Sequence, residues 1–168
     1  MSSCEEGYRL LEESFGHGKD NVIALATLGR EPSPRGTPQP LVRGVDAYYE
    51  DGVFYAVTNG QSNKMLQIAD NPEVSVASCS EMFTATAVGE NLGWALAPQN
   101  VELRAKLRAA FAAWYDRVNN ERDENCCFLA LRLVQGTLNI GHGEQVYHLD
   151  FANRKEGEVQ GQRGGTDR

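Results

Sequence analysis

Long apolar runs and an excess of positive charge are both absent from this 168-residue chain. No stretch approaches the ~18 apolar residues of a membrane-spanning helix, and residues 1–13 are acidic where a signal peptide would be basic and then apolar. The sequence therefore predicts a cytoplasmic protein with no membrane partner. Because 23 acidic side chains outnumber 16 basic ones, no nucleic-acid partner is expected, although the balance still allows a local basic pocket for one phosphate.

Cysteine pairing motifs are also absent. The chain has four cysteines without any Cys-x-x-Cys spacing: Cys4, Cys79, Cys126 and Cys127. Adjacent residues of a strand point to opposite faces, so Cys126 and Cys127 are poorly placed to bind one zinc ion. We therefore expect the cysteines to be small, buried hydrophobic side chains in a reducing compartment.

The motifs of several enzyme classes are missing as well. There is no Ser nucleophile elbow, no Gly-x-Gly-x-x-Gly loop and no paired-carboxylate motif, which leaves hydrolysis and Rossmann-type NAD binding without support. His142, Glu144 and His148 could suggest a metal, but their spacing on a strand only places polar residues on one face. A histidine beside two glycines is typical of a turn, and no metal site is predicted.

What is present is a succession of short apolar segments separated by turn residues. Their composition predicts strands at residues 21–28, 41–49, 53–58, 73–80, 81–94, 126–138 and 144–151. Helical spacing predicts helices at residues 5–15, 62–69 and 98–118, the last with one apolar face made of Leu103, Leu107, Ala110, Phe111 and Trp114. Four prolines within residues 30–40 predict a wide loop or a ragged edge connection.

The predicted strands are mostly consecutive and joined by hairpins, which disfavours a parallel sheet. Closing many short strands into a barrel protects their edges, so we expect a mainly β (α+β) protein: a six- to seven-stranded antiparallel β-barrel with peripheral helices. A chain of this length is expected to form a single domain, here residues 1–153. Residues 154–168 contain almost nothing apolar and are predicted to form a polar, flexible tail.

One segment between a strand and a short helix carries chemistry suited to a phosphate. It reads Thr58-Asn59-Gly60-Gln61-Ser62-Asn63-Lys64. Backbone N–H groups at the helix start and the hydroxyls of Thr58 and Ser62 offer hydrogen-bond donors. The Asn63 amide adds another donor, and the Lys64 ammonium adds a full positive charge for a dianion. Ser62 could equally be an ordinary helix N-cap.

A second cation, Arg43, lies on the strand that the Glu50-Asp51-Gly52 hairpin pairs with residues 53–58. Because these two strands are neighbours, Arg43 can point toward the predicted phosphate segment, where its planar guanidinium would add a fork of donors. The alternative is a surface arginine that forms a cross-strand ion pair with Glu50 or Asp51.

The order of these features resembles the pyridoxamine 5'-phosphate oxidase-related family of FMN-binding split barrels. The resemblance covers roughly residues 22–151 and rests on Pro40-Leu41-Val42-Arg43, the hairpin, the strand ending in Thr58, Ser62-Asn63-Lys64-Met65, Asn71-Pro72-Glu73-Val74 and the later segments 83–85 and 89–94. It implies FMN bound at a homodimer interface, with the phosphate held by Arg43, Ser62, Asn63 and Lys64. The flavin ring would lie along the backbone of Val57 and Thr58.

Two features depart from that family. The proline-rich stretch at residues 30–40 is longer than the family's usual tight hairpin, which puts the register of the preceding strand in doubt. The chain also ends in Tyr147-His148-Leu149-Asp150-Phe151 and a polar tail, without the Arg-Leu-Asn-Arg-like segment of the vitamin B6 oxidases. The activity of those oxidases is therefore not expected here.

The resemblance implies an FMN-dependent oxidoreductase that passes a hydride or electrons between a reduced donor and a small acceptor, with the flavin supplying the chemistry. The alternative is a non-enzymatic flavin or haem binding protein or stress protein on the same fold, and a third reading is an empty barrel kept for dimerisation. In a homodimer, Trp94 and residues 89–93 are the candidates for the partner side of the flavin.

Overall fold

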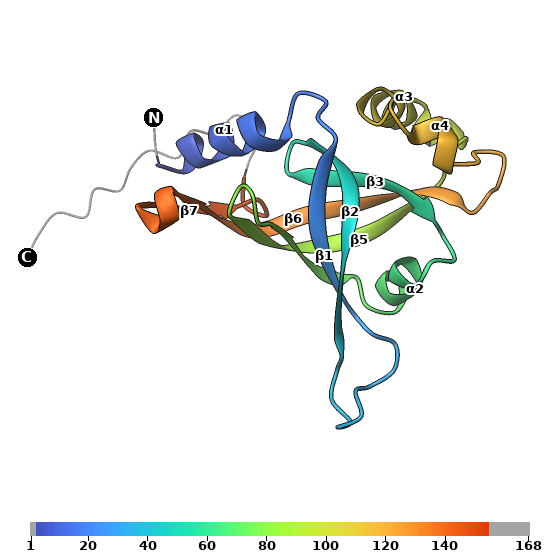
Figure 1. Cartoon of the computed structure of the whole chain (residues 1–168), viewed down its shortest axis with the longest axis horizontal. Helices are drawn as coiled ribbons and strands as arrows, with labels where there is room; N and C mark the ends of the chain where they lie inside the picture. The colour runs from blue at the N-terminus through green and yellow to red at the C-terminus, as the bar shows by residue number, and fades with distance from the viewer. Residues whose placement is uncertain (1–2, 155–168) are drawn as a thin grey trace, which may run out of the picture.

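Seven strands form one antiparallel sheet in the computed structural model, which describes residues 3–154 (Figure 1). The strands are β1 (Asn21–Leu28), β2 (Pro40–Glu50), β3 (Val53–Asn59), β4 (Glu73–Ser78), β5 (Phe83–Trp94), β6 (Cys126–Ile140) and β7 (Gln145–Asp150). Their order is β3-β2-β1-β4-β5-β6-β7, and β3 also pairs with β6. The second pairing closes six strands into a barrel with β7 added on β6, so the predicted antiparallel barrel is confirmed.

The helices lie around this barrel (Figure 1). They are α1 (Ser3–Phe15), α2 (Asn63–Asp70), α3 (Val101–Ala110) and α4 (Tyr115–Val118), with 3₁₀ turns η1 (Pro98–Asn100) and η2 (Gly141–Gly143). α1 packs against β7, α2 follows β3 near the ends of β1 and β5, and α3 lies beside β3. Within the described part of the chain, no helix has the length and apolar character needed to cross a membrane.

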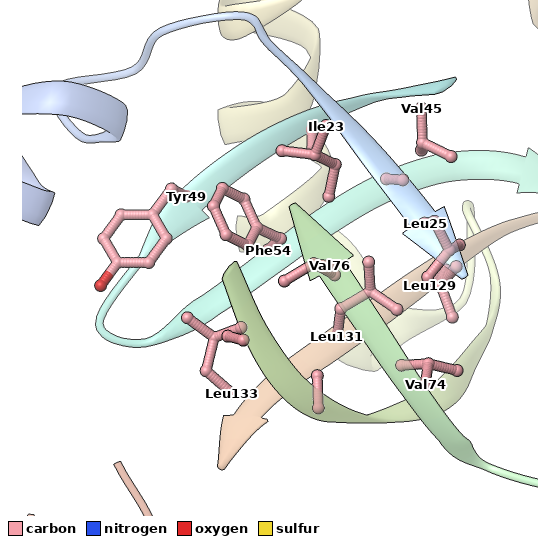
Figure 2. Close-up of a cluster of buried hydrophobic side chains, with 14 of the residues drawn as sticks. Ile23, Leu25, Val45, Tyr49, Phe54, Val74, Val76, Leu129, Leu131 and Leu133 are labelled. Atoms are coloured by element: carbon pink, nitrogen blue, oxygen red, sulfur yellow. The ribbon is translucent and has the colours of Figure 1, made fainter. Parts of the chain in front are cut away.

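Strand alternation divides the buried apolar side chains between two cores. The first core fills the barrel, and Figure 2 shows side chains from different strands converging in it, among them Ile23, Leu25, Phe54, Val76 and Leu131. The second core lies between the outer faces of β3 and β6 and the helices α3 and α4. Cys127 belongs to the first core and Cys126 to the second, as expected for adjacent residues of one strand.

The prediction that all cysteines are buried is wrong for Cys4 and Cys79, which are exposed. Cys4 lies in the first turn of α1, and Cys79 lies in the turn between β4 and β5. Neither position belongs to a strand face that another layer covers, so a small apolar residue there stays in contact with solvent.

The long helix predicted at residues 98–118 is wrong as a single element, although its apolar face is correct. α3 ends where Phe111 leaves helical geometry (φ −102°, ψ 22°), and a tight turn leads into α4. Leu107, Phe111 and Tyr115 are buried in the second core. Within the turn, Trp114 Nε1 donates to Asp20 at 2.7 Å, and at the start of α4 the Tyr115 hydroxyl donates to Glu121 at 2.9 Å. These tertiary hydrogen bonds favour the bend over a straight continuation, which apolar spacing cannot report.

The proline-rich connection between β1 and β2 does not disturb the register of either strand. The two strands pair without interruption from Asn21 opposite Ala47 to Leu28 opposite Pro40. Beyond them the Gly29 N–H donates to the Gln39 carbonyl at 2.7 Å, so the hairpin continues past the strand ends. A compact turn closes it, and the far end of the hairpin projects from the barrel in Figure 1. Of the two predicted alternatives, the ragged edge is therefore wrong, and residues 29–39 form a loop.

α1 covers the outer edge of β7. The Tyr8 hydroxyl donates to the Asp150 carbonyl at 2.8 Å and accepts the Asp150 N–H at 3.1 Å, as a neighbouring strand would. The Arg154 guanidinium lies 4.1 Å from the centre of the Tyr8 ring. The rest of the predicted tail, residues 155–168, lies outside the described residues, and the division into one domain and a tail stays a prediction.

Candidate functional site

The predicted phosphate residues meet at one end of the barrel, where β2, β3 and α2 come together. Val45, Ala47 and Tyr49 of β2 point into the barrel core, so Arg43 faces the same side by alternation. Lys64 lies in the first turn of α2, directly after β3. Burial and the nearby charge of Arg43 both lower the pKa of Lys64, so the two cations are close enough to repel each other. The structure therefore brings Arg43 and Lys64 together.

Arg43 is held by neutral groups. Its Nη1 donates to the Thr27 hydroxyl at 2.6 Å and to the Leu25 carbonyl at 3.3 Å, and its Nη2 donates to the Gln67 side-chain oxygen at 2.9 Å. The alternative of a cross-strand ion pair with Glu50 or Asp51 is wrong, because Glu50 pairs with Lys106 and no ion pair within the described residues joins Arg43 to Asp51. Burial lowers the pKa of Arg43 from its ordinary value, as expected for a charge that is partly removed from water.

Ser62 occupies the N-cap position of α2 but does not cap it. Its backbone is extended (φ −67°, ψ 153°), as in an ordinary N-cap, yet its side chain makes no capping hydrogen bond. The hydroxyl oxygen is buried and has no hydrogen-bond partner among the described residues. A buried hydroxyl left without a partner carries a free-energy cost, so this atom fits a site that an outside ligand completes.

The charges of the site are not balanced within the described chain. None of the ion pairs formed within residues 3–154 includes Arg43 or Lys64. The first N–H groups of α2 add partial positive charge beside Ser62, because they have no acceptor inside the helix. Two cations, a buried hydroxyl and a helix start together form a site that suits an anion with several acceptor oxygens.

The remaining predicted residues lie around this centre with different exposure. Thr58 is half-buried and pairs with Cys127 of β6, Val57 packs on the second core, and Asn63 is exposed at the start of α2. The pairing of β2 with β3 runs only from Glu50 opposite Val53 to Tyr48 opposite Tyr55. The β2–β3 pairing does not continue past Tyr55, so the edge of β3 at Val57 and Thr58 is left without a β2 partner.

Two residues of the site, Thr27 and Gln67, were not predicted. Both are polar and almost fully buried, at 3% and 7% exposure. A threonine in an apolar strand and a glutamine one helical turn after Lys64 are weak signals, but each marks a polar side chain on an otherwise buried face. The sequence does not indicate that Thr27 and Gln67 are buried in this site, because their burial depends on how β1, β2 and α2 pack together.

A separate groove of about 670 Å³ lies on the outer face of the sheet. Small side chains of β1, β4 and β5 line much of it, including Ala24, Ala26, Ser75, Ala77, Thr84 and Thr86. Val42 of β2 also lines the groove, whereas Arg43 points to the other face of the same strand. The groove and the cation site therefore lie on opposite sides of the β1–β2 hairpin.

The buried thiol of Cys127 makes the free energy of unfolding depend on pH in the alkaline range. Burial raises its pKa to about 11, above the ordinary value of 9.0, so the stability that the neutral thiol contributes is present below about pH 9 and is lost as the pH rises toward about 11. We expect Cys127→Ala to reduce the alkaline loss of unfolding free energy by up to about 2 kcal/mol, measured by urea unfolding at about pH 8 and pH 11. Lys64, with its lowered pKa, acts in the opposite sense and is present in both proteins. Equal alkaline losses in the two proteins would contradict this assignment.

Comparisons with known proteins support the fold. A scan against protein-family models and a search of curated proteins found no match. A haem-binding protein of Mycobacterium smegmatis matches 90% of this chain at 17% identity with a TM-score of 0.60, and the match spans 59% of that protein. A pyridoxamine 5'-phosphate oxidase-related, FMN-binding protein of Nostoc punctiforme matches 88% of this chain at 15% identity with a TM-score of 0.51, and the match spans 89% of that protein. An FAD-binding protein of Mesorhizobium loti matches 76% of this chain at 18% identity with a TM-score of 0.52, and the match spans 90% of that protein. The chain thus has the split-barrel fold of these proteins.

Proposed function

We propose that this chain binds FMN through Arg43, Lys64 and Ser62 and uses it in the oxidation or reduction of a small substrate. The observation that carries the proposal is a pair of half-buried cations, without a carboxylate partner in the described chain, beside the unpaired Ser62 hydroxyl. A terminal phosphate would supply the missing negative charge and acceptor oxygens. Two of the structural neighbours named above bind flavins, which supports the class of cofactor.

Bound FMN would supply the hydride or electron transfer. The chain's own residues would bind and orient the cofactor: Arg43, Lys64 and Ser62 hold its phosphate, with Asn63 at the rim. The free edge of β3 at Val57 and Thr58 offers backbone N–H and C=O groups to the flavin ring. The proposal includes a cytoplasmic location, where the free thiols of the chain would stay reduced.

Titration of the purified protein with FMN, riboflavin and FAD, followed by flavin fluorescence and absorbance, tests the proposal. We expect FMN to bind at least about tenfold more tightly than riboflavin, because riboflavin lacks the phosphate. Equal affinities would overturn the phosphate site. Oxidation of NADH, NADPH or reduced deazaflavin by the holoprotein, assayed against a panel of acceptors, would separate an oxidoreductase from a flavin carrier, and pyridoxamine 5'-phosphate serves as the substrate that we expect to be inert.

A haem carrier is the second candidate. The observation that favours it is His148, the imidazole that lines the outer groove among small side chains. Haem bound there would give a Soret band that is altered by His148→Ala and unaffected by Lys64→Ala. The FMN proposal predicts the reverse pattern for flavin absorbance, so the same two variants distinguish the candidates.

A homodimer is part of the proposal. The outer groove is lined by small side chains and by Val42, and Val42 and Val22 are each 68% exposed. Exposed apolar surface of this kind is typical of an interface. The other predicted dimer contact, Trp94 with residues 89–93, makes contacts within its own chain: Gly89 packs against Ile68, and the Trp94 indole donates to the Glu121 carbonyl. The outer groove is therefore the more open of the two faces.

We expect the wild-type protein to sediment as a dimer at micromolar concentration and Ala77→Arg, which places a charge in the groove, to sediment as a monomer. Ala105→Arg, on the exposed side of α3, is the matched control and should remain a dimer. A monomeric wild-type protein that binds FMN normally would overturn the dimer, and a dimeric Ala77→Arg would move the interface to another face.

A further inference from the structure

Gln67 is the least expected member of the cation site. It is only 7% exposed, and its side-chain oxygen accepts two hydrogen bonds: one from the Thr27 hydroxyl at 2.7 Å and one from Arg43 Nη2 at 2.9 Å. The Thr27 hydroxyl in turn accepts from Arg43 Nη1 at 2.6 Å. The three side chains therefore form a closed ring of hydrogen bonds that fixes the position of the guanidinium.

The partners in this ring are neutral. A partly buried arginine is commonly paired with a carboxylate, which offsets the cost of burying its charge but also cancels that charge. Here an amide and a hydroxyl take the place of the carboxylate, so Arg43 is oriented while its positive charge is retained. The charge of Lys64 is likewise uncompensated, and burial and Arg43 both lower its pKa.

The ring also leaves donors free. A guanidinium has five N–H groups, and Thr27, Leu25 and Gln67 engage only the Nη1 and Nη2 atoms. Within the described residues, the Nε–H and one Nη2 hydrogen stay available for an outside acceptor. The pinned guanidinium and the nearby Lys64 ammonium thus present two positive charges to one small region beside the Ser62 hydroxyl.

We propose that Gln67 is a positioning residue that determines the charge selectivity of this site, which takes a terminal phosphate dianion in preference to a singly charged phosphodiester. The inference rests on the proposed flavin site and deepens it. A phosphate monoester carries close to two negative charges at neutral pH. Each phosphorus of a dinucleotide pyrophosphate carries a single charge and lacks a free terminal group. The site therefore selects FMN over FAD as well as over riboflavin.

The decisive variant is Gln67→Glu, which keeps the size of the side chain and adds the carboxylate that the native site avoids. At about pH 8 we expect the affinity for FMN to fall by at least about tenfold, because the new carboxylate pairs with Arg43 and cancels one of the two positive charges. The affinity for riboflavin, which has no phosphate, should stay within about twofold, so the FMN-to-riboflavin ratio collapses. Gln145→Glu, on exposed β7, is the matched control for the change in net charge and should leave the ratio unchanged.

Gln67→Met provides a second, independent test that adds no charge. It removes the acceptor that holds Nη2, so Arg43 keeps its charge but loses its fixed position, and we expect a fall of about three- to tenfold in FMN affinity with riboflavin unaffected. If Gln67→Glu fails to fold, which thermal denaturation would show, Gln67→Met tests the positioning role of Gln67 by itself. An unchanged FMN-to-riboflavin ratio in Gln67→Met would then overturn the positioning role.

The results of these titrations distinguish the proposed flavin site from the role of Gln67 in it. A wild-type protein without preference for FMN over riboflavin contradicts the proposed function itself. A wild-type protein that prefers FMN, together with a Gln67→Glu variant that keeps the full preference, overturns the role of Gln67 alone. A wild-type protein that binds FAD as tightly as FMN overturns the selectivity for a terminal dianion.

Discussion

Arg43→Ala and Lys64→Ala are each expected to weaken FMN binding by roughly 1.5 to 3 kcal/mol, or about 10- to 150-fold in the dissociation constant. Each substitution removes a charge-assisted hydrogen bond to the phosphate from a partly desolvated site, where such bonds are stronger than at the surface. Fluorescence titration of the apoprotein with FMN and with riboflavin measures the effect, and only the FMN affinity should change.

Lys106→Ala and Arg30→Ala are the matched controls for this experiment. Both side chains are exposed and form surface ion pairs, Lys106 with Glu50 and Arg30 with Asp70. Exposed pairs of this kind contribute about 0 to 1 kcal/mol, so the controls should leave FMN affinity within about twofold. If Arg43→Ala or Lys64→Ala weakened riboflavin binding as much as FMN binding, the substitution would be damaging the fold and the assignment of the phosphate site would be wrong.

Phe15→Ala is expected to lower the free energy of unfolding by about 3 to 5 kcal/mol, the range for truncating a buried aromatic side chain. Phe15 ends α1 and is 1% exposed, and its ring lies 5.3 Å from that of Phe54 and 5.6 Å from that of Phe83. The substitution opens a cavity between α1 and the barrel. Urea unfolding, followed by both far-UV circular dichroism and tryptophan fluorescence, measures the loss.

Tyr8→Phe is the control for the same helix. It keeps the ring and removes only the hydroxyl that bonds to Asp150, so a loss of about 1 kcal/mol is expected. A loss below about 1 kcal/mol for Phe15→Ala, or two separate unfolding transitions in the wild-type protein, would show that α1 is not part of the barrel's cooperative unit.

Local patterns in the sequence were sufficient for the strands, for the hairpin at Glu50-Asp51-Gly52 and for the opposite directions of Cys126 and Cys127. These features depend on neighbours within a few residues, because strand alternation and turn chemistry are short-range properties. The meeting of Arg43 with Lys64 was also predictable, since one hairpin joins the strand of Arg43 to the strand that leads into α2.

Tertiary structure alone decided the features that depend on distant segments. The bend between α3 and α4 is favoured by hydrogen bonds to Asp20 and Glu121, two residues outside the helical segment that its apolar spacing cannot indicate. Thr27 and Gln67 lie 40 residues apart, and they become partners of Arg43 only because β1, β2 and α2 meet at one end of the barrel. The sequence by itself determined which residue types could bind a phosphate. Only the packing decided that Arg43 and Lys64 are partly removed from water without a carboxylate partner in the described chain, an arrangement that suits an anion because burial makes uncompensated charge costly.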